Sequence, residues 1–160
     1  MPINKDRTFA FAAGLGFSYQ AYSQNLLVVE EEGVYTYSII ESDVSFRKNR
    51  FTTLNIDLPI EFRWRTSTPQ SHKFFRLYTG FKVSYLLYDE SRFISSQGNS
   101  IVKNNPELNA LQYGVYLASG YNTWNFYAYY GINPLYDNVK IGSNTLDVSL
   151  IHLGLQFYIL

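Results

Sequence analysis

Period-two alternation of side chains over long segments is the feature that most limits the possible folds of this chain. In residues 9–20, Phe9, Phe11 and Leu15 fall on one face with other bulky apolar residues, while the residues between them are small or polar. Successive side chains of a β-strand point to opposite sides. A helix would need apolar residues three or four positions apart, and this segment lacks that spacing. We therefore expect a β-strand with two unlike faces.

Five further segments repeat this alternation. They comprise residues 51–65, 75–87, 111–120, 124–132 and 151–159. Most reach the length of about ten residues that a tilted strand needs to cross the hydrocarbon layer of a membrane. The chain is thus expected to be all-β and to form a single domain over residues 1–160. Its predicted architecture is an antiparallel up-and-down transmembrane β-barrel with about six recognisable long strands.

The links between these segments alternate between short and long. Links 66–72 and 121–124 are short turns, whereas links 23–50, 89–109 and 134–145 are long and rich in polar residues. Outer-membrane barrels have short periplasmic turns and long extracellular loops. Residues 34–40 alternate in part and are expected to extend a hairpin beyond the membrane. Recognition is expected in links 23–50 and 89–109, because loops on a rigid scaffold tolerate variation.

Alternation alone leaves open which face meets lipid. A soluble lipocalin-like barrel that carries an apolar ligand is the alternative to a membrane barrel. The polar face is rich in glycine, as expected inside a narrow barrel, and Trp64 and Trp124 lie at strand ends beside the short turns. With Tyr121 and Phe157 they are expected to form an aromatic girdle at one membrane interface. These features favour the outer membrane of a Gram-negative bacterium, with outer-membrane lipid as a partner.

Charge and cysteine content exclude several classes of function. The formal net charge is zero, so the chain has no basic field to attract nucleic acid. It has no cysteine and 2 histidines, too few for most metal sites, and no cofactor or metal is expected. His152 could serve a lipid-modifying hydrolase, but no G-x-S-x-G motif or clear triad accompanies it, so no catalytic residue is expected.

Charged residues recur on the polar faces of the second and third segments. They are Asp57, Glu61, Arg63, Arg65, Arg76 and Lys82. Buried charges are retained when opposite signs pair, so we expect a charge network that fills the lumen rather than an acid/base or ion-conducting site. A turn centred in residues 67–72 predicts that Glu61 pairs with Arg76, and that Asp57 lies close to Lys82.

Three strand motifs carry a family resemblance. The runs AGLGFSY (13–19), NIDLPIEFR (55–63) and YTGFKVSY (78–85) resemble Bacteroidota outer-membrane β-barrel proteins of the PorT-like group. The resemblance extends over most of residues 9–160. The C-terminal segment is similar to the insertion signal of such barrels, carried here by His152, Gly154, Phe157 and Ile159.

The resemblance implies an eight-stranded barrel that is associated with type IX secretion and gliding. This chain shows fewer convincing spans than the minimum of about eight in such barrels, so two strands are expected upstream of Met1. The function that the resemblance implies is that of a non-enzymatic accessory or structural component of a secretion or surface machine. Protein partners within a larger membrane complex are implied as well.

Overall fold

The computed structural model describes residues 3, 8–41, 44–66, 74–96, 98–137 and 139–157. In this part of the chain all regular structure is β. The strands are β1 (Phe9–Ala13), β2 (Gly16–Ser23), β3 (Leu26–Glu31), β4 (Val34–Ile39), β5 (Phe46–Arg65), β6 (Phe75–Ser95), β7 (Asn99–Lys103), β8 (Leu111–Tyr121), β9 (Trp124–Gly131), β10 (Lys140–Ile141), β11 (Asn144–Thr145) and β12 (Ile151–Phe157). Among the described residues, none lies in a helix that is long and apolar enough to cross a membrane.

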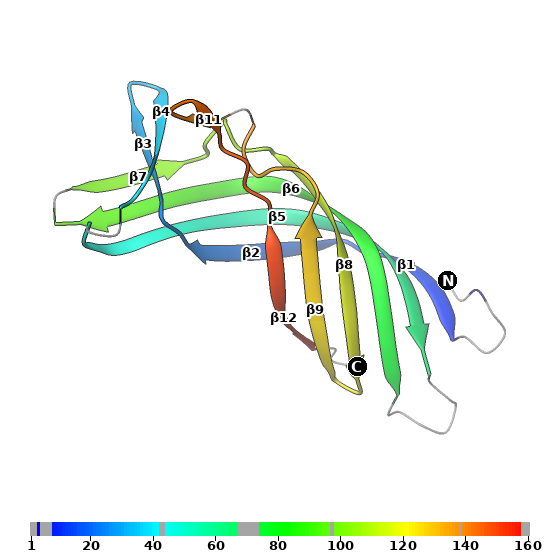
Figure 1. Ribbon diagram of the computed structural model, residues 1–160. Helices are drawn as coiled ribbons and strands as arrows, with labels where there is room; N and C mark the ends of the chain where they lie inside the picture. The colour runs from blue at the N-terminus through cyan, green and yellow to red at the C-terminus, as the bar shows by residue number, and fades with distance from the viewer. Residues whose placement is uncertain are drawn as a thin grey trace.

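One antiparallel sheet forms a strongly curved wall. Its order is β1-β5-β6-β8-β9-β12, with β2 also paired to β5 and β7 to β6 (Figure 1). All six segments that alternate in the sequence are strands of this wall, which confirms the all-β antiparallel prediction. Sequence neighbours pair through most of the wall, as expected for an up-and-down arrangement.

The first segment is interrupted, whereas a single strand was expected. β1 and β2 pair with β5 on either side of residues 14–15, and the Gly14 amide donates to the Pro59 carbonyl at 3.0 Å. Pro59 has no N–H with which to return a bond, so the hydrogen-bonded ladder is broken opposite it. The proline therefore accounts for the break in its neighbour.

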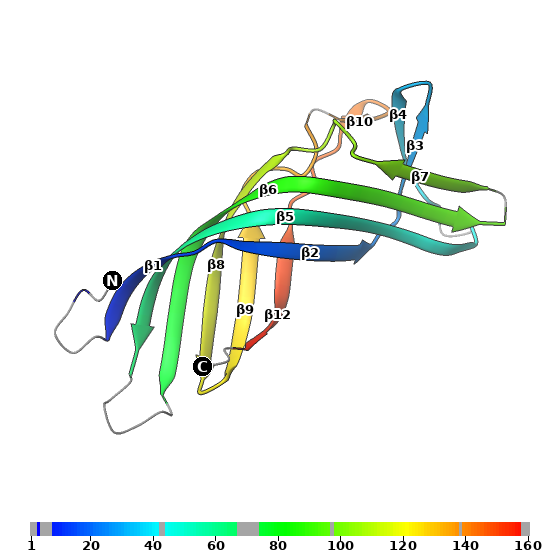
Figure 2. The ribbon, with the colours of Figure 1, turned by 180° about the vertical axis from the view of Figure 1, so that it is seen from behind.

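The hairpin of β5 and β6 is much longer than its alternation suggested. The strands contain 20 and 21 residues and extend past the rest of the wall as an arm (Figure 2). Parts of links 23–50 and 89–109, expected to be loops, are strand. A register shift lies between Leu54 and Asn55, where β6 contains one extra residue. Such a bulge bends a strand and increases its twist, and β5 and β6 bend in their middle in Figures 1 and 2.

The arm carries a second layer that we call the cap. It consists of the β3–β4 hairpin, the β10–β11 hairpin and the connections between them, while β7 stays part of the curved sheet. A hydrophobic core joins the cap to the arm, formed by Leu26, Val28, Tyr37, Phe51, Val102, Leu108, Leu135, Tyr136 and Val139. The β3–β4 hairpin confirms the expected hairpin at residues 34–40.

Aromatic residues follow the rim of the wall that carries the short turns. Cross-strand partners there are Phe9 with Trp64, Phe75 with Tyr121, and Trp124 with both Tyr121 and Phe157. Trp64 also packs edge-on against Phe75, with ring centroids 5.9 Å apart. Trp64 and Trp124 thus lie at the same end of the sheet, as the predicted topology requires.

The wall has one strand edge on each side without a strand partner among the described residues. These edges belong to β12 on one side and to β1 and β2 on the other. Lipid cannot satisfy backbone N–H and C=O groups, so such edges need partners in a membrane. The side chains of Tyr22 and His152 meet across the interior between them, at 2.8 Å.

Candidate functional site

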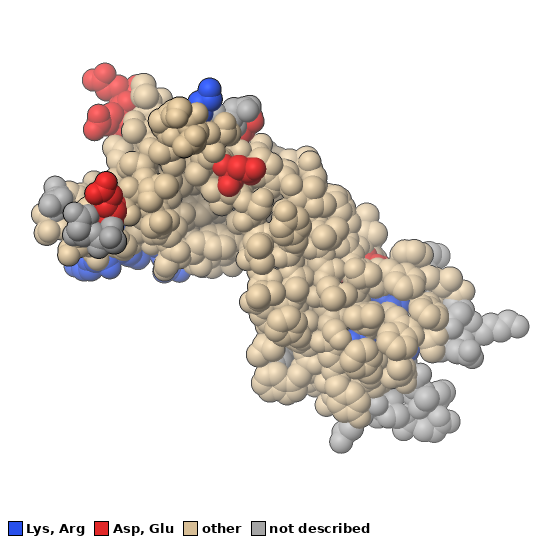
Figure 3. All heavy atoms as spheres, in the orientation of Figure 1, with Lys and Arg blue, Asp and Glu red and all other residues tan. Residues whose placement is uncertain are grey.

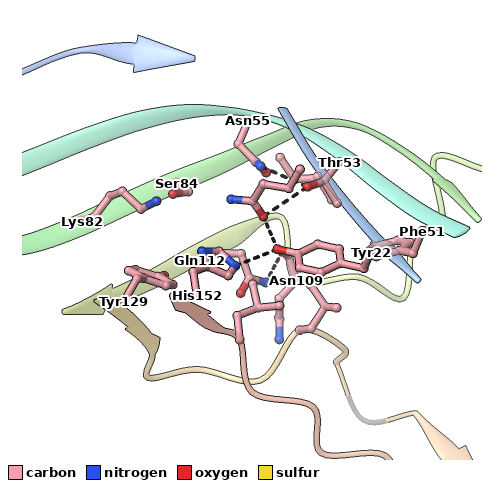
Figure 4. Close-up of a pocket in the computed structure, with 14 residues that line it drawn as sticks. Tyr22, Phe51, Thr53, Asn55, Lys82, Ser84, Asn109, Gln112, Tyr129 and His152 are labelled. Atoms are coloured by element: carbon pink, nitrogen blue, oxygen red, sulfur yellow. Dashed lines mark hydrogen bonds between the residues drawn. The ribbon is translucent and has the colours of Figure 1, made fainter. Parts of the chain in front are cut away.

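A polar cluster fills the interior of the wall just below the cap. Figure 4 shows that its side chains converge from β2, β5, β6, β8, β9 and β12. The polar members include Gln20, Tyr22, Thr53, Asn55, Ser84, Gln112 and His152. Because each strand alternates, its inward face is polar while the outward face is apolar, as the exposure of Phe17, Leu58 and Leu153 shows.

Tyr22 and His152 close this interior. The Tyr22 hydroxyl hydrogen-bonds to Nε2 of His152 and also donates to Gln20, which lies two residues earlier on β2 (Figure 4). The His152 ring stacks on Tyr129, with centroids 5.0 Å apart. β2, β9 and β12 are thereby connected through side chains.

Lys82 lies below this cluster in contact with a carboxylate and an aromatic ring. Its Nζ is 3.5 Å from Oδ2 of Asp57 and 4.5 Å from the ring centroid of Tyr129. Both charged side chains are largely shielded from solvent. The expected contact between Asp57 and Lys82 is therefore present, reached diagonally because Asp57 stands opposite Ser84 and Lys82 opposite Pro59.

The predicted pair of Glu61 and Arg76 is wrong. Glu61 stands opposite Gly80, and Arg76 stands opposite Arg65. Glu61 instead contacts Arg63 on its own strand, where the arginine side chain is 39% exposed. The register of β5 and β6 places Glu61 four residue pairs away from the pair of Arg65 and Arg76.

The remaining charges lie toward the short-turn rim. The Arg63 guanidinium lies 5.2 Å from the ring centroid of Tyr78, and that of Arg76 lies 4.7 Å from Phe74. Arg76 is buried, and Arg65 is half-buried beside it on the neighbouring strand. The six residues expected in the network thus fall into separate groups, of which Asp57 with Lys82 is an ion pair with both side chains largely shielded from solvent.

Of the residues expected to act as an insertion signal, His152, Gly154 and Phe157 lie on β12. Gly154 stands opposite Tyr127, and Phe157 stands opposite Trp124. His152 faces the lumen cluster. Ile159 lies outside the described residues.

The cluster does not present the constellation of a hydrolase in the described part of the chain. His152 hydrogen-bonds to a tyrosine, whereas a catalytic triad joins it to a serine and a carboxylate. Groups of three or more His, Asp or Glu suited to a metal ion are also lacking among the described residues. The arrangement can pack, seal and stiffen the lumen.

Several members of the cluster were not singled out from the sequence. Tyr22 falls just past the expected end of the first strand, although the alternation of Gln20 and Tyr22 continues on the inward face. The alternation of residues 124–132 places Tyr129 on the inward face, but its contacts with Lys82 and His152 depend on register across β6, β9 and β12. Strand alternation predicts which face of the sheet a residue occupies, but not its position along the barrel axis relative to residues on other strands.

The family comparison decides the class of this protein. Residues 1–137 match the family model described as outer membrane protein beta-barrel domain. The chain belongs to this outer-membrane β-barrel family. Searches of curated proteins and of solved structures gave no match.

The outer-membrane barrel resides in the outer membrane of Gram-negative bacteria, where its apolar outer face contacts lipid. By the rule that periplasmic turns are short, we expect the aromatic rim to be periplasmic and the cap extracellular. The soluble alternative required an apolar interior around a ligand. It is wrong, because the interior of the barrel is polar and its large apolar side chains are exposed.

A buried carboxylate on β6 lies beneath the cap of the outer-membrane barrel. Asp89 is 2% exposed and accepts hydrogen bonds from the backbone amide of Asn105, while the Asn105 side chain donates to Tyr37. Burial raises the pKa of Asp89 to about 6, and the amide of Asn105 opposes part of this rise. Asp89 therefore ties the connection after β7 to β6, and Asn105 carries the link on to the β3–β4 hairpin. Burial makes this arrangement less favourable when Asp89 is ionised.

We expect the cap to become more stable as pH falls from 7.5 to 5. The folded pKa of Asp89 is above its ordinary value of 3.8, so the folded state binds more protons between about pH 4 and pH 6 and gains stability as pH falls through that window. Hydrogen exchange of residues 103–108, corrected for intrinsic rates, would measure this gain. Asp89→Asn should remove it, whereas Asp147→Asn, at an exposed position, should keep it. Equal pH dependence in all three proteins would contradict the assignment.

Proposed function

We propose that this barrel is a non-enzymatic accessory or structural component of a secretion or surface machine, and that it recognises a protein partner through its cap. The observation that carries the proposal is the ordered hydrophobic core of the cap. Long loops that only connect strands do not need such a core. A rigid extracellular layer is the kind of surface on which recognition residues are held in place.

A groove in the cap offers the contact surface. It lies between the β3–β4 hairpin and the ends of β6 and β7, and its volume is about 1050 Å³ when the part open to solvent is included. Apolar side chains line much of it, including Leu27, Val29, Ile39, Val44 and Phe93. Ile39 is 59% exposed. An apolar groove with a polar rim favours a protein segment as its occupant.

The resemblance to PorT-like proteins is our ground for proposing which machine this barrel serves. We propose the type IX secretion and gliding apparatus on that resemblance, which goes beyond the shared outer-membrane β-barrel domain. The two strand edges without partners are in keeping with the eight-stranded wall of that group. We propose that further strands complete the wall between β12 and β1–β2.

Co-purification with matched variants tests the recognition proposal. The wild-type protein, extracted gently from its native membrane, should retain a defined set of companion proteins. Ile39→Lys should lose them, because a charge in the groove must be desolvated on binding. Val34→Lys, at the same hairpin but outside the groove, should keep them.

Two outcomes would contradict this proposal. If the wild-type preparation contains no companion proteins, the proposed role in a larger machine is wrong. If the two lysine variants retain the same companions, the groove is not the contact surface. Both positions are exposed, so both variants are expected to fold. Heat-modifiable migration on gels would verify that the barrel has formed in each.

A further inference from the structure

The outer surface of the arm carries a basic cluster. The cluster lies immediately above the band of apolar, lipid-facing residues on the outer face of the wall, which we call the apolar belt. On β5 the outward residues change from Leu54, Ile56 and Leu58 to Arg50 and Lys48, while the alternate residues stay buried. From Trp64 to Leu54 the strand advances ten residues. At about 3.3 Å per residue and a tilt of about 45° this is a rise of about 23 Å, close to the height of a lipid-facing belt. Arg50 is therefore placed at the headgroups of the outer leaflet.

Neighbouring strands add cations to the same face. Arg50 stands directly opposite Arg92 on β6, and Lys103 on β7 stands opposite Glu90. Glu90 is the one carboxylate that the described residues place among them. It binds Arg92 at 2.8 Å and lies 3.9 Å from Lys103. Four cations with one carboxylate leave an excess of three positive charges.

Arg50 has no carboxylate partner in the described part of the chain. Its Nη2 donates to the Tyr19 hydroxyl at 3.4 Å. Like charges directly opposite on a sheet repel each other, so the pair of Arg50 and Arg92 is unfavourable unless an anion lies against it. Hydrogen bonds from Arg92 hold the pKa of Glu90 below its ordinary value, so Glu90 stays ionised and occupied.

The surface beside Arg50 is hollowed. A shallow depression of about 920 Å³, open to solvent, is lined by Ser23, Gln24, Asn25, Phe46, Arg47, Lys48, Asn49 and Arg50. Figure 3 shows basic side chains gathered along the underside of the arm, with acidic side chains above them. The charge separation directs the basic side toward the membrane and the acidic side away from it. A phosphorylated headgroup matches this hollow in charge and position.

We propose that the outer face of the arm binds the phosphate groups of lipid A in the outer leaflet, with Arg50, Lys48 and Arg92 as the phosphate ligands. Guanidinium groups form strong, paired hydrogen bonds with phosphate oxygens. The acyl chains of the lipid then lie against Leu54, Ile56 and the other apolar residues below. The site would hold the arm at a fixed height above the membrane surface.

Binding of two lipid A forms to the purified full chain tests this proposal. The probes are diphosphoryl lipid A and a dephosphorylated form with the same acyl chains, measured by native mass spectrometry from zwitterionic detergent at about 0.15 M salt. Diphosphoryl lipid A should bind more tightly. Arg50→Gln should weaken that binding about tenfold, as expected for one charged hydrogen bond. Lys140→Gln, which removes the same charge from an exposed site in the cap, should leave it unchanged.

A second variant acts in the opposite direction. Glu90→Gln removes the competing carboxylate and should tighten binding of diphosphoryl lipid A several-fold, so the proposal does not depend on a variant that loses binding. Equal binding of the two lipid forms would overturn the proposal, as would equal losses in Arg50→Gln and Lys140→Gln. Full displacement of the lipid by millimolar inorganic phosphate would assign the cluster to a free anion instead.

Discussion

Replacing Lys82 with methionine is expected to lower the free energy of unfolding by about 3 kcal/mol, because it leaves the Asp57 carboxylate buried without its counter-ion. Lys82 is 9% exposed, and its Nζ lies 3.5 Å from Asp57. Methionine has a similar volume, so little of the loss would come from a cavity. The contact between Nζ and the Tyr129 ring would also be lost.

A double-mutant cycle separates the charge effect from other losses. Asp57→Asn should be destabilising by itself, while the double variant with Lys82→Met should recover much of the stability, since no buried charge then remains. Urea unfolding in lipid vesicles can be followed by fluorescence of Trp64 and Trp124. The matched control is the pair of Glu90 and Arg92 on the outer face, where we expect a coupling below about 1 kcal/mol. A coupling that small for Asp57 and Lys82 would contradict their role in stabilising the lumen.

The corrected register changes the expectation for Glu61. Its contact is with Arg63 on the same strand, near the rim, and the arginine is partly exposed. Such a pair contributes about 1 kcal/mol or less. Removal of Glu61 is therefore expected to lower the free energy of unfolding less than removal of Lys82 does. The alternation in the sequence does not distinguish the two, because it places both on the polar face.

Alternation predicted the strands and their faces because both depend on local geometry. Phe9, Leu58 and Leu153 are exposed on the outer face, as their position in the period requires. The overrun of β5 and β6 into the arm was missed because polar residues such as Asn49 and Ser91 are buried there. They pack beneath the cap, and the cap exists only once distant segments meet.

Register was the part of the site that the sequence did not determine. The strands β5 and β6 are joined by residues 66–74, and the pairing of Arg65 with Arg76 decides which lumen charges meet. A bulge on β6 shifts the register again above Leu54. The contact of Tyr22 with His152 depends on the curvature of the whole wall, because 130 residues separate the two in sequence. Contacts between such distant residues do not change the local alternation of the sequence, so the alternation does not predict them.

Replacing Gly114 with alanine is expected to destabilise the barrel by about 3 kcal/mol or more, at the upper end of what overpacking costs. A Cβ at this position would lie 2.3 Å from the Tyr130 carbonyl oxygen and 2.6 Å from Cζ of Tyr129. The carbonyl belongs to the backbone of β9, which pairs with β8. Tyr129 in turn contacts Lys82 and His152, so its displacement would disturb the lumen cluster as well.

Gly154→Ala provides the matched control, since Gly154 also sits in a wall strand and its Cβ would meet nothing within 4 Å. We expect its unfolding free energy to change by less than about 1 kcal/mol. Urea unfolding and the heat-modifiable gel shift would compare the two variants, and equal stability would show that β8 and β9 can separate to admit a methyl group. The double variant with Tyr129→Ala distinguishes the two clashes. The double variant lacks the Tyr129 ring but keeps the Tyr130 carbonyl, so it should remain destabilised. Full recovery of stability would show that the clash in Gly114→Ala is with the ring alone.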